Sequence, residues 1–551
     1  HKVMINKIKI ENLSIFNSKN DILVDNINLN IIENAITAII GESGSGKTIT
    51  AHSIMGLLPP TLKFSQESKI LYYYNHHEVN LLKINKKQWR TLRSKKISMI
   101  FQNPMSSLHP LIKCGEQIAE VLKVHTNYSP AKRKENVLEI LQQVGFDNAT
   151  RIYDAYPHQL SGGEQQRVII SMAMISKPEM LIADEPTTAL DAQIQLEIIN
   201  LIKDLKTKFH CTVLFISHDL SLVHSFADYI YVMKSGKIVE HGPTNVIFEN
   251  PSEEYTQLLL RCKPTLTYTP YRLPTLHQKY DFNLLNATKK SNNIIGDIVL
   301  NVENLNVIHQ NKTIWGQKVY NHILKNINFN VKSNECLGII GESGSGKTTL
   351  LKTILGLIKP DSGLVEYKGE KLDIISNRTK NLFRSIQWVQ QNPYTSLPPN
   401  MAIGKHFNAI LKLHNIGKNA DERNKIISET IELCQMPVDI LDRYPHQFSG
   451  GQLQRLAIAQ ALLVNPEIIL LDEPVSSLDV SIQAAIINLL NDIKDNKKIT
   501  YLFITHDIML ANYFCDSLIV LYKGEIVEQG LSKDIIKKPQ HSYTKLLINS
   551  Y

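Results

Sequence analysis

The residues best suited to chemistry in this sequence are two copies of one octapeptide, G-E-S-G-S-G-K-T, at Gly41–Thr48 and Gly341–Thr348. Both fit the pattern G-x-x-x-x-G-K-[ST], in which glycines let the backbone turn tightly and aim N–H groups at phosphate oxygens. Lys47 and Lys347 would reach the β- and γ-phosphates of ATP, and the threonine after each lysine would ligate Mg²⁺. The ATP-binding residues expected in these loops are Gly41, Glu42, Ser43, Gly44, Ser45, Gly46, Lys47, Thr48, Gly341, Glu342, Ser343, Gly344, Ser345, Gly346, Lys347 and Thr348.

The motif Asp-Glu-Pro occurs at residues 184–186 and 472–474, each time after four apolar residues that indicate a buried strand. In both copies the aspartate has the reach to hold Mg²⁺. The adjacent glutamate is placed to polarise an attacking water, in effect as a general base. The expected magnesium ligands are therefore Asp184 and Asp472, and the expected catalytic glutamates are Glu185 and Glu473.

The elements around these residues indicate an α/β fold. Ala35–Ile40, before the first octapeptide, is a β-branched run that indicates a buried strand, and Ile49–Leu57 after it is apolar and suited to a helix. Cys336–Ile340 precedes the second octapeptide in the same way. Strand, glycine loop and helix form the context that the phosphate-binding pattern requires. Open α/β sheets bind ligands at the carboxyl ends of their strands, where the acidic pairs also fall.

Internal repetition predicts the domain organisation. The motifs Y-P-H-Q-[LF]-S, D-E-P and I-[ST]-H-D recur 288 residues apart, whereas the octapeptides recur 300 apart, so the first half carries a net insertion, expected around Thr61–Asn80. A period this long indicates two domains rather than many short repeats. The expected boundaries are 1–250 for the first domain, 251–264 for a first C-terminal element, 265–296 for a linker, 297–538 for the second domain and 539–551 for a second C-terminal element.

Composition narrows the class of protein. With 43% hydrophobic and 20% charged residues, the 551-residue chain has the profile of a folded globular protein. The net charge of +8 is mild for this length and fits a lysine-rich solvated surface, so no nucleic-acid partner is expected. No run approaches the ~20 apolar residues of a membrane span, and the start shows no secretory signal. The six scattered cysteines form no C-x-x-C pair, which fits a reducing cytosol.

Further repeated motifs resemble those of the ABC ATPases. L-S-G-G-E at Leu160–Glu164 and F-S-G-G-Q at Phe448–Gln452 resemble the ABC signature. F-Q-N-P and Q-Q-N-P, at 101–104 and 390–393, resemble the Q-loop, while A-L-D and S-L-D, ending at Asp191 and Asp479, resemble the D-loop. The match covers nearly the whole chain. It implies two P-loop NTPase domains of the ABC type in tandem, each followed by a short C-terminal element.

The resemblance implies that two cassettes close head to tail with two ATP molecules between them, so that the two halves of this chain pair with each other. The phosphate loop of one half would face the signature of the other. The helix-like stretch that begins at each signature suits an anion, because its free N–H groups point at the ligand. The residues expected to cap the γ-phosphate are Ser449, Gly450 and Gly451 at the Lys47 site, and Ser161, Gly162 and Gly163 at the Lys347 site.

The resemblance also assigns roles outside the loops. Gln102 and Gln391 would sense Mg²⁺ and the attacking water, and His218 and His506 would contact the γ-phosphate and orient that water as catalytic residues. Because every motif is intact twice, we expect two hydrolysis-competent sites. For adenine stacking, the candidate in the first half is Phe16, and those in the second half are His309, Trp315 and Tyr320.

Three features resemble the peptide-importer branch of the family: Y-P-H-Q before each signature, S-S-L-H-P or T-S-L-P-P after the Q-loop, and the C-terminal elements at 251–264 and 539–551. The order of elements resembles the fused ATPase subunits of Gram-negative peptide importers, including the microcin C type. This implies two transmembrane permease subunits, a periplasmic substrate-binding protein and a location at the cytoplasmic face of the bacterial inner membrane. Peptide, peptide-like antibiotic, glutathione and nickel chelate stay open as the substrate.

A rival interpretation is a soluble tandem ABC ATPase that acts on ribosomes as a translation factor. Such proteins usually have a long, charged, helical linker, whereas the linker here is short and contains proline. DNA-repair ABC ATPases would need zinc-binding cysteine pairs. Some dipeptide-importer ATPases carry a cysteine cluster near the C-terminal element, but Cys262 stands alone there, so no iron–sulfur cluster is expected.

Overall fold

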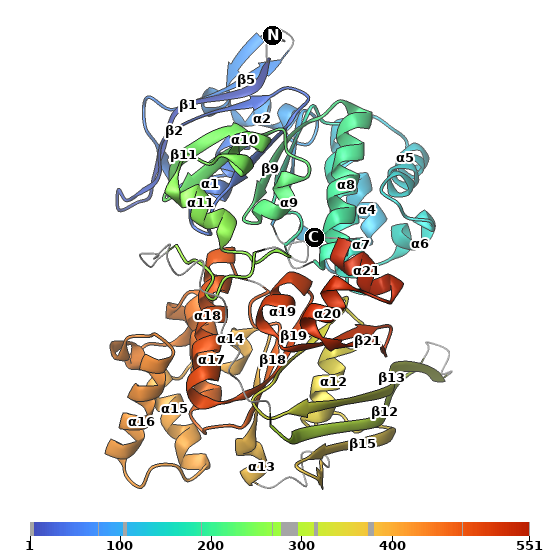
Figure 1. Ribbon diagram of the computed structural model, residues 1–551. Helices are drawn as coiled ribbons and strands as arrows, with labels where there is room; N and C mark the ends of the chain where they lie inside the picture. The colour runs from blue at the N-terminus through green and yellow to red at the C-terminus, as the bar shows by residue number, and fades with distance from the viewer. Residues whose placement is uncertain are drawn as a thin grey trace. The chain divides into compact units, whose positions relative to one another are not determined.

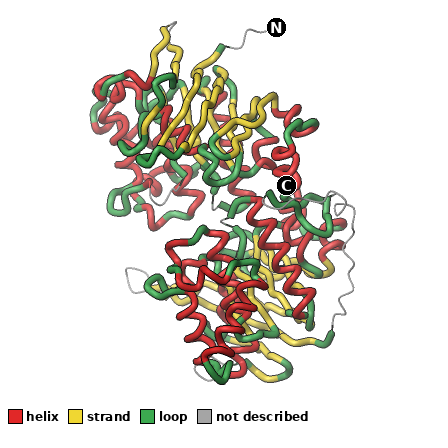
Figure 2. Tube along the Cα trace, turned by 90° about the vertical axis from the view of Figure 1, so that its left-hand side faces the viewer, coloured by secondary structure: helices red, strands yellow, loops and turns green. Residues whose placement is uncertain are grey.

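The computed structural model describes residues 5–74, 77–102, 107–188, 190–266, 268–276, 296–312, 318–372, 380–476 and 478–549. It contains two compact units, His1–Leu260 and Arg261–Tyr551 (Figure 1). Each unit has a six-stranded, mainly parallel sheet and a second, antiparallel sheet. Helices flank the strands in both units (Figure 2). The α/β fold class expected from the sequence is confirmed.

The main sheet of the first unit has the strand order β11-β10-β3-β9-β8-β7, in which only β11 runs antiparallel to its neighbour. Every residue of β3, β7, β8 and β9 is buried, as expected for parallel strands covered on both faces. Parallel strands end at one edge of the sheet, so the residues that follow them meet there. These strands are β3 (Ile36–Ile40), β7 (Ile97–Ile100), β8 (Met180–Asp184), β9 (Thr212–Ser217), β10 (Tyr229–Lys234) and β11 (Lys237–Pro243).

The second unit repeats this sheet, with the order β17-β18-β19-β14-β20-β21 and again one antiparallel edge strand, β21. The strand that precedes the second phosphate loop therefore has the same two neighbours as its counterpart in the first unit. The strands are β14 (Cys336–Ile340), β17 (Ile386–Val389), β18 (Ile468–Asp472), β19 (Thr500–Thr505), β20 (Ser517–Tyr522) and β21 (Glu525–Leu531).

In each unit the antiparallel sheet shares a hydrophobic core with the parallel strands and with the helix that follows the phosphate loop. In the first unit β4 pairs with β1, within the region where extra length was expected. The strands of the first unit are β1 (Asn6–Phe16), β2 (Ile22–Ile32), β4 (Lys63–Phe64), β5 (Lys69–Tyr74) and β6 (His77–Asn80). Those of the second unit are β12 (Ile298–Lys312), β13 (Lys318–Lys332), β15 (Ser362–Tyr367) and β16 (Glu370–Lys371).

Most helices recur in the same order in both units, although a 3₁₀ helix at Val438–Asp442 takes the place of α6 in the second. Among the described residues no helix is long and apolar enough to cross a membrane. Up to residue 261 the helices are α1 (Lys47–Ile54), α2 (Lys86–Leu92), α4 (Cys114–His125), α5 (Pro130–Gln143), α6 (Ala149–Asp154), α7 (Gly162–Met174), α8 (Ala192–Phe209), α9 (Leu220–His224), α10 (Thr244–Glu249) and α11 (Glu254–Arg261). After it they are α12 (Lys347–Ile354), α13 (Lys380–Ser385), α14 (Pro393–Ser396), α15 (Ile403–Leu413), α16 (Ala420–Leu433), α17 (Gly450–Leu462), α18 (Val480–Lys497), α19 (Ile508–Phe514), α20 (Ser532–Lys537) and α21 (Ser542–Asn549).

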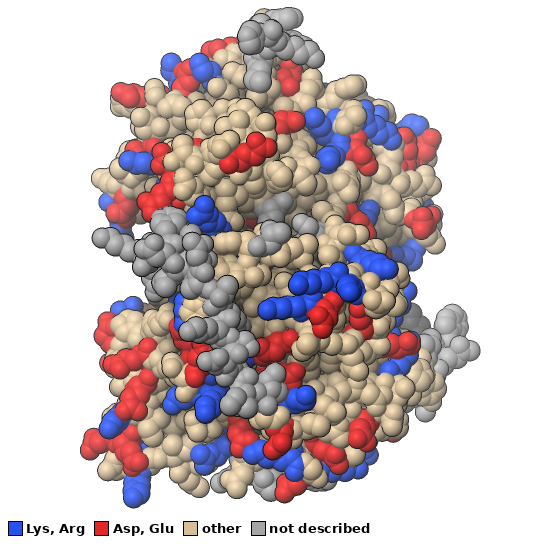
Figure 3. All heavy atoms as spheres, viewed as in Figure 1, with Lys and Arg blue, Asp and Glu red and all other residues tan. Residues whose placement is uncertain are grey.

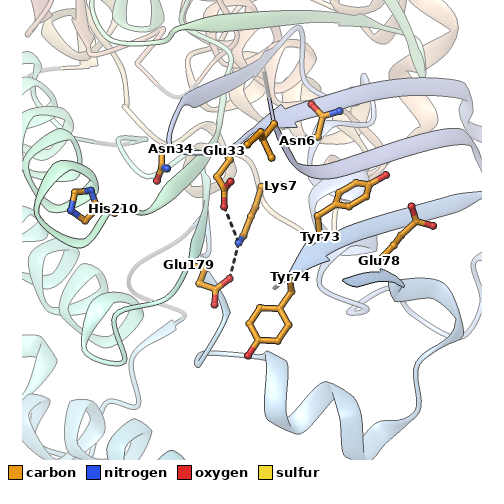
Figure 4. Close-up of a pocket in the computed structure, with 10 residues that line it drawn as sticks. Asn6, Lys7, Glu33, Asn34, Tyr73, Tyr74, Glu78, Glu179 and His210 are labelled. Atoms are coloured by element: carbon orange, nitrogen blue, oxygen red, sulfur yellow. Dashed lines mark hydrogen bonds and ion pairs between the residues drawn. The ribbon is translucent and has the colours of Figure 1, made fainter. Parts of the chain in front are cut away.

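An ion-pair network closes the amino-terminal edge of the first parallel sheet. Glu179 directly precedes β8, and its carboxylate receives Lys7 of β1 at 2.7 Å and the Tyr72 hydroxyl at 3.0 Å. Lys7 also contacts Glu33 at 3.3 Å (Figure 4). A pocket of 890 Å³ opens beside this network. The bonds of Lys7 and Tyr72 to Glu179 join the two sheets of this unit. Because Asp184 ends β8 at the opposite edge, the pocket lies away from the phosphate loop.

The first part of the expected linker packs on the second unit. The main chain of Leu273 exchanges two hydrogen bonds with the Asn488 side chain, at 3.1 and 2.8 Å, and the Arg272 guanidinium pairs with Asp492. The Leu273 side chain is 2% exposed and belongs to the core of that unit. The described residues of this segment, 261–266 and 268–276, are thus part of the second unit. Most of the remaining expected linker lies outside the described residues.

Candidate active sites

The first phosphate loop connects β3 to α1 at the carboxyl edge of the parallel sheet. A Cβ atom at Gly41 would lie 2.2 Å from the Met233 carbonyl oxygen, so no other residue fits there. Gly44 and Gly46 have φ values of 77° and 101°, a left-handed backbone that glycine adopts at little cost. Gly341 is confined in the same way by the Leu521 carbonyl oxygen at 2.3 Å.

The two loop lysines are buried and turned onto their own loops. Lys47 Nζ donates to the carbonyl oxygens of Gly41 and Glu42 at 2.8 and 2.7 Å. Lys347 Nζ makes the equivalent bonds at 2.7 and 2.8 Å. Each ammonium group is thereby held inside the curve of its loop, where the phosphates of a nucleotide would bind.

The aspartate at the end of each central strand faces the threonine of its loop. The Thr48 hydroxyl donates to Asp184 Oδ1 at 3.2 Å, and the Thr348 hydroxyl lies 3.5 Å from Asp472 Oδ1. Burial and the charge of the adjacent glutamate raise the pKa of both aspartates to about 6. Two oxygen-bearing side chains at this spacing suit a divalent cation such as Mg²⁺.

Glu185 is the centre of a hydrogen-bonded cluster drawn from three strand ends. Its Oε2 accepts from Gln102 Nε2, after β7, at 3.0 Å and lies 3.2 Å from His218 Nδ1, after β9. The Thr188 hydroxyl donates to the same oxygen at 3.0 Å. Burial opposes ionisation, but His218, Lys47 and Gln102 outweigh it and lower the pKa of Glu185 to about 2. The carboxylate is therefore charged at physiological pH and available to accept a hydrogen bond from water.

The second unit builds the same cluster around Glu473. Gln391 Nε2 donates to Glu473 Oε2 at 3.2 Å, and His506 Nδ1 lies 3.4 Å from that oxygen. Burial again opposes ionisation, and His506 and Lys347 lower the pKa of Glu473. The structure thus gathers both sets of loop, aspartate, glutamate, glutamine and histidine that the sequence singles out.

The backbone of both glutamates is left-handed, with φ of 46° at Glu185 and 44° at Glu473. Non-glycine residues adopt this conformation at a cost of about 1 kcal/mol. A hydrogen bond from the amide of each glutamate to the neighbouring strand, at Ile216 O and Ile504 O, holds it there at 3.0 Å. With this turn, each carboxylate lies within reach of the Q-loop glutamine and the histidine described above.

Comparison with known proteins identifies the family to which these motifs belong. The family model described as "ABC transporter" matches residues 24–188 and 324–476, and the model "Oligopeptide/dipeptide transporter, C-terminal region" matches 239–282 and 527–551. The chain is 38% identical over 530 residues to the peptidoglycan transport ATP-binding protein YejF of Agrobacterium fabrum, covering 96% of this chain and 92% of that protein. It is also 38% identical to the glutathione import ATP-binding protein GsiA of Escherichia coli, over 98% of this chain and 89% of that protein.

The chain belongs to the ABC transporter family. It is a fused tandem ABC ATPase, with two P-loop NTPase domains and an oligopeptide/dipeptide-transporter C-terminal region after each. These predictions from the sequence are confirmed. A solved cassette of the ABC transporter complex cbiONQ, cbiO1 of Clostridium perfringens, is 30% identical over 44% of this chain and 92% of its own, with a TM-score of 0.39.

The ABC signatures lie at the starts of α7 and α17. Ser161 caps α7 through a reciprocal pair of bonds, its hydroxyl accepting from the Glu164 amide at 3.3 Å and its own amide donating to the Glu164 carboxylate at 2.9 Å. Ser449 and Gln452 form the same capping box in the second cassette. Each signature therefore leads into a helix whose first turn is capped by residues of the same cassette.

The second glycine of each signature is required by packing as well. A Cβ atom at Gly163 would lie 2.9 Å from Ile194 of α8, and one at Gly451 would lie 2.5 Å from Ile482 of α18. The glycines therefore let each signature helix approach the helix that follows the D-loop. Gly162 and Gly450 precede them in the first turns of the two helices.

The residues present fit a bound triphosphate. Within the part of the chain that the structure describes, the buried hydroxyls of Ser45 and Ser345 have no hydrogen-bond partner. A buried hydroxyl without a partner is costly, and a phosphate oxygen over the loop would provide one. Both serines belong to the same loops as the buried lysines, so the side chains of the two loops fit the phosphates of a nucleotide.

Some sequence predictions fall outside this cluster. Asn103 and Pro104 of the first Q-loop, Ala189 and Ser477 of the D-loops and Trp315 lie outside the described residues. Phe16, His309 and Tyr320 lie on the antiparallel sheets, in β1, β12 and β13, and their role toward adenine stays a prediction. Thr188 was not singled out from the sequence, although its position three residues after the glutamate recurs in the second half as Ser476.

Proposed function

We propose that this ATPase powers the uptake of peptides or peptide-like compounds through an ABC importer. The observation that carries the proposal is the match of the oligopeptide/dipeptide-transporter C-terminal region after both cassettes. The names of two relatives, for peptidoglycan transport and glutathione import, support the same class of cargo. The translation-factor alternative gains no support from these matches.

Each ATP would bind between the phosphate loop of one cassette and the signature of the other. Ser449, Gly450 and Gly451 would cap the γ-phosphate at Lys47, because helix starts with free N–H groups favour an anion. The signature at Ser161 would act in the same way at Lys347. Glu185 and Glu473 would each orient the attacking water, with His218 and His506 holding the glutamate and the γ-phosphate in place.

Mg²⁺ would be held at each site by the loop threonine and the strand-end aspartate, with the Q-loop glutamine nearby. The hydroxyl–carboxylate distance of 3.2 Å at Thr48 and Asp184 supports this assignment. When bound, the cation neutralises charge on the β- and γ-phosphates. The equivalent ligands of the second site are Thr348, Asp472 and Gln391.

The partners proposed are two transmembrane permease subunits and a periplasmic substrate-binding protein, with this chain at the cytoplasmic face of the bacterial inner membrane. Exposed apolar side chains beside the Q-loops support a docking surface for the permeases: Phe101 and Leu111 in the first cassette, and Tyr394 and Met401 in the second. Lysines, arginines, aspartates and glutamates are interspersed on the face shown in Figure 3, which is typical of a solvated surface.

The test is to tag the chain in its native host, extract membranes gently and identify the proteins that co-purify. Two polytopic permeases, at about one each per ATPase chain, are the expected result. The purified complex is then assayed for ATP hydrolysis with short peptides, glutathione, peptidoglycan-derived peptides and a nickel chelate. Stimulation by a peptide, absent when Glu185→Gln and Glu473→Gln are combined, would support the proposal. Ribosomal proteins without a permease would overturn it.

A further inference from the structure

The C-terminal region of each cassette returns to the phosphate loop through one tyrosine. The Tyr255 hydroxyl of α11 accepts a hydrogen bond from the backbone amide of Glu42 at 3.4 Å. In the second cassette the Tyr543 hydroxyl of α21 accepts from the backbone amide of Glu342 at 2.9 Å. The same contact is thus built twice, between residues more than 200 positions apart in the sequence.

Each tyrosine is buried, and its ring is held by a different neighbour in the two cassettes. Lys234 Nζ, at the end of β10, lies 4.7 Å from the centre of the Tyr255 ring. The Tyr543 ring stacks on Tyr522, at the end of β20, with centroids 4.2 Å apart. The packing partners differ while the target of the hydroxyl is the same, so the hydrogen bond to the loop is the shared feature.

A carboxylate of the edge strand anchors the helix that carries each tyrosine. Glu240 of β11 accepts from the amide and hydroxyl of Ser252 at 2.7 and 2.8 Å, just before α11. Glu528 of β21 accepts from the amides of Gln540 and His541 at 3.0 and 3.2 Å, just before α21. Carboxylates at these positions fix the helix start, so the tyrosine approaches the loop from a rigid base.

The bonded amide belongs to the peptide segment that also positions the loop lysine. The Glu42 carbonyl accepts from Lys47 while the Glu42 amide donates to Tyr255, and the pair Glu342 and Lys347 repeats this arrangement. Release of the amide would let this part of the loop rotate and would move the carbonyl away from the lysine.

We propose that Tyr255 and Tyr543 are positioning residues for ATP binding, which hold each phosphate loop in its nucleotide-ready shape. The oligopeptide-transporter C-terminal region thereby acts as a support of the loop. The effect belongs to the binding step: once the phosphates occupy the loop, they impose the same shape themselves. ATP affinity therefore depends on the tyrosine hydroxyl, and the rate at saturating ATP does not.

The experiment compares Tyr255→Phe, Tyr543→Phe and the double variant in the full chain, with Tyr522→Phe as the matched control. The control removes a hydroxyl from the ring stacked on Tyr543 and leaves the bond to Glu342 intact. Equilibrium binding of ATP is measured in the Glu185→Gln, Glu473→Gln background, and KM and kcat are measured in the active chain. Melting temperature is recorded without nucleotide. None of these readouts depends on the transported substrate.

We expect the double variant to bind ATP about fivefold more weakly, with KM raised in proportion and kcat unchanged, since a neutral hydrogen bond is lost at each site. Tyr543→Phe should have the larger single effect, because its bond is shorter. Unchanged affinity in the double variant would overturn the proposal. An equal loss in Tyr522→Phe, or a fall in melting temperature that accounts for the lost affinity, would overturn it as well.

Discussion

At the scale of single residues, the adjacent carboxylates of each site are in electrostatic conflict when no nucleotide is bound. Asp184 is 1% exposed and beside the charged Glu185, which with burial raises the pKa of Asp184 from 3.8 to about 6. An acid whose pKa is higher in the folded state loses stability as pH rises between the two values. The carboxylates of Asp184 and Glu185 therefore repel each other in the nucleotide-free site, and a bound divalent cation would reduce this repulsion.

Asp184→Asn should therefore stabilise the nucleotide-free chain at pH 7.5, on the order of 1–3 kcal/mol from the size of the shift, while Mg²⁺-ATP hydrolysis is lost. At pH 5.5 the gain should be smaller, because most of Asp184 is then protonated in the unmodified protein. Calorimetry of both proteins at the two pH values measures this difference. An equal gain at both pH values would show that ionisation of Asp184 is not the cause.

The residues of the two ATP sites could be predicted from the sequence, because binding phosphate, activating water and holding a cation require particular residue types at particular spacings. The left-handed backbone of Glu185 could not, since it follows from where β8 ends relative to β9. The contact of Tyr255 with Glu42 could not be predicted from the spacing of the motifs either. It depends on how a helix beyond the sheet edge packs back on the loop.

At the scale of elements, the signature helices are placed by close packing on the helices that follow the D-loops. Gly451→Ala should force α17 away from α18, because the new Cβ would lie 2.5 Å from Ile482. We expect ATP hydrolysis to fall by at least about tenfold and stability to fall by roughly 1–3 kcal/mol.

Adding Ile482→Ala should restore much of the stability and part of the hydrolysis, since it removes the atoms that clash. Melting curves and ATPase rates of the single and double variants check this. If Ile482→Ala rescues neither property, the packing explanation for the second glycine is wrong, and its role lies only in the contact with nucleotide.

The segment after α11 behaves as part of the second unit rather than as a free connection. Leu273→Ala should destabilise that unit by about 2–4 kcal/mol, as for other buried leucines. Leu266→Ala is the matched control, since Leu266 is 49% exposed against 2% for Leu273. Chemical denaturation followed by a probe in the second unit measures both. Equal midpoints for the two variants would contradict this packing.

The strands and helices around the motifs were predictable because their apolar runs are bounded by glycines and acidic turns. The attachment of residues 268–276 was not predictable, because it rests on single side chains such as Arg272 and Asn488 in a stretch without periodicity. The extra length of the first half includes the short strand β4, within the expected region. The domain boundaries themselves stay predictions.

At the scale of the whole molecule, two complete sites in one chain predict coupled hydrolysis. Glu185→Gln alone should lose at least about nine-tenths of turnover while ATP binding persists, since the carboxylate acts after binding. Glu473→Gln should do the same. Steady-state ATPase assays and nucleotide-binding assays on each variant test this. Full turnover after either single change would overturn the claim of two coupled sites, and a loss of only about half would show that the sites work independently.

The duplicated architecture followed from one long repeat period, and the family relatives are fused over nearly the same length. What the sequence leaves open at this scale is the cargo, because the residues that would select it would belong to the proposed permeases and binding protein. The two cassettes are chemically alike at Lys47, Lys347 and the residues around them, so neither site is marked as inactive.

The left-handed backbone at Glu185 and Glu473 has a consequence for how a duplicated ATPase responds to mutation at these positions. Glycine and asparagine adopt that conformation more easily than glutamate, so replacing either glutamate with one of them would remove a backbone cost of about 1 kcal/mol and abolish the chemistry of that site. The hydrogen bonds that Gln102 and Gln391 donate to the two glutamates would be lost with the change, and they oppose this gain in the backbone. The same left-handed turn recurs in both cassettes, so either site could lose its glutamate without a change in the path of the backbone, and this chain retains glutamate at both.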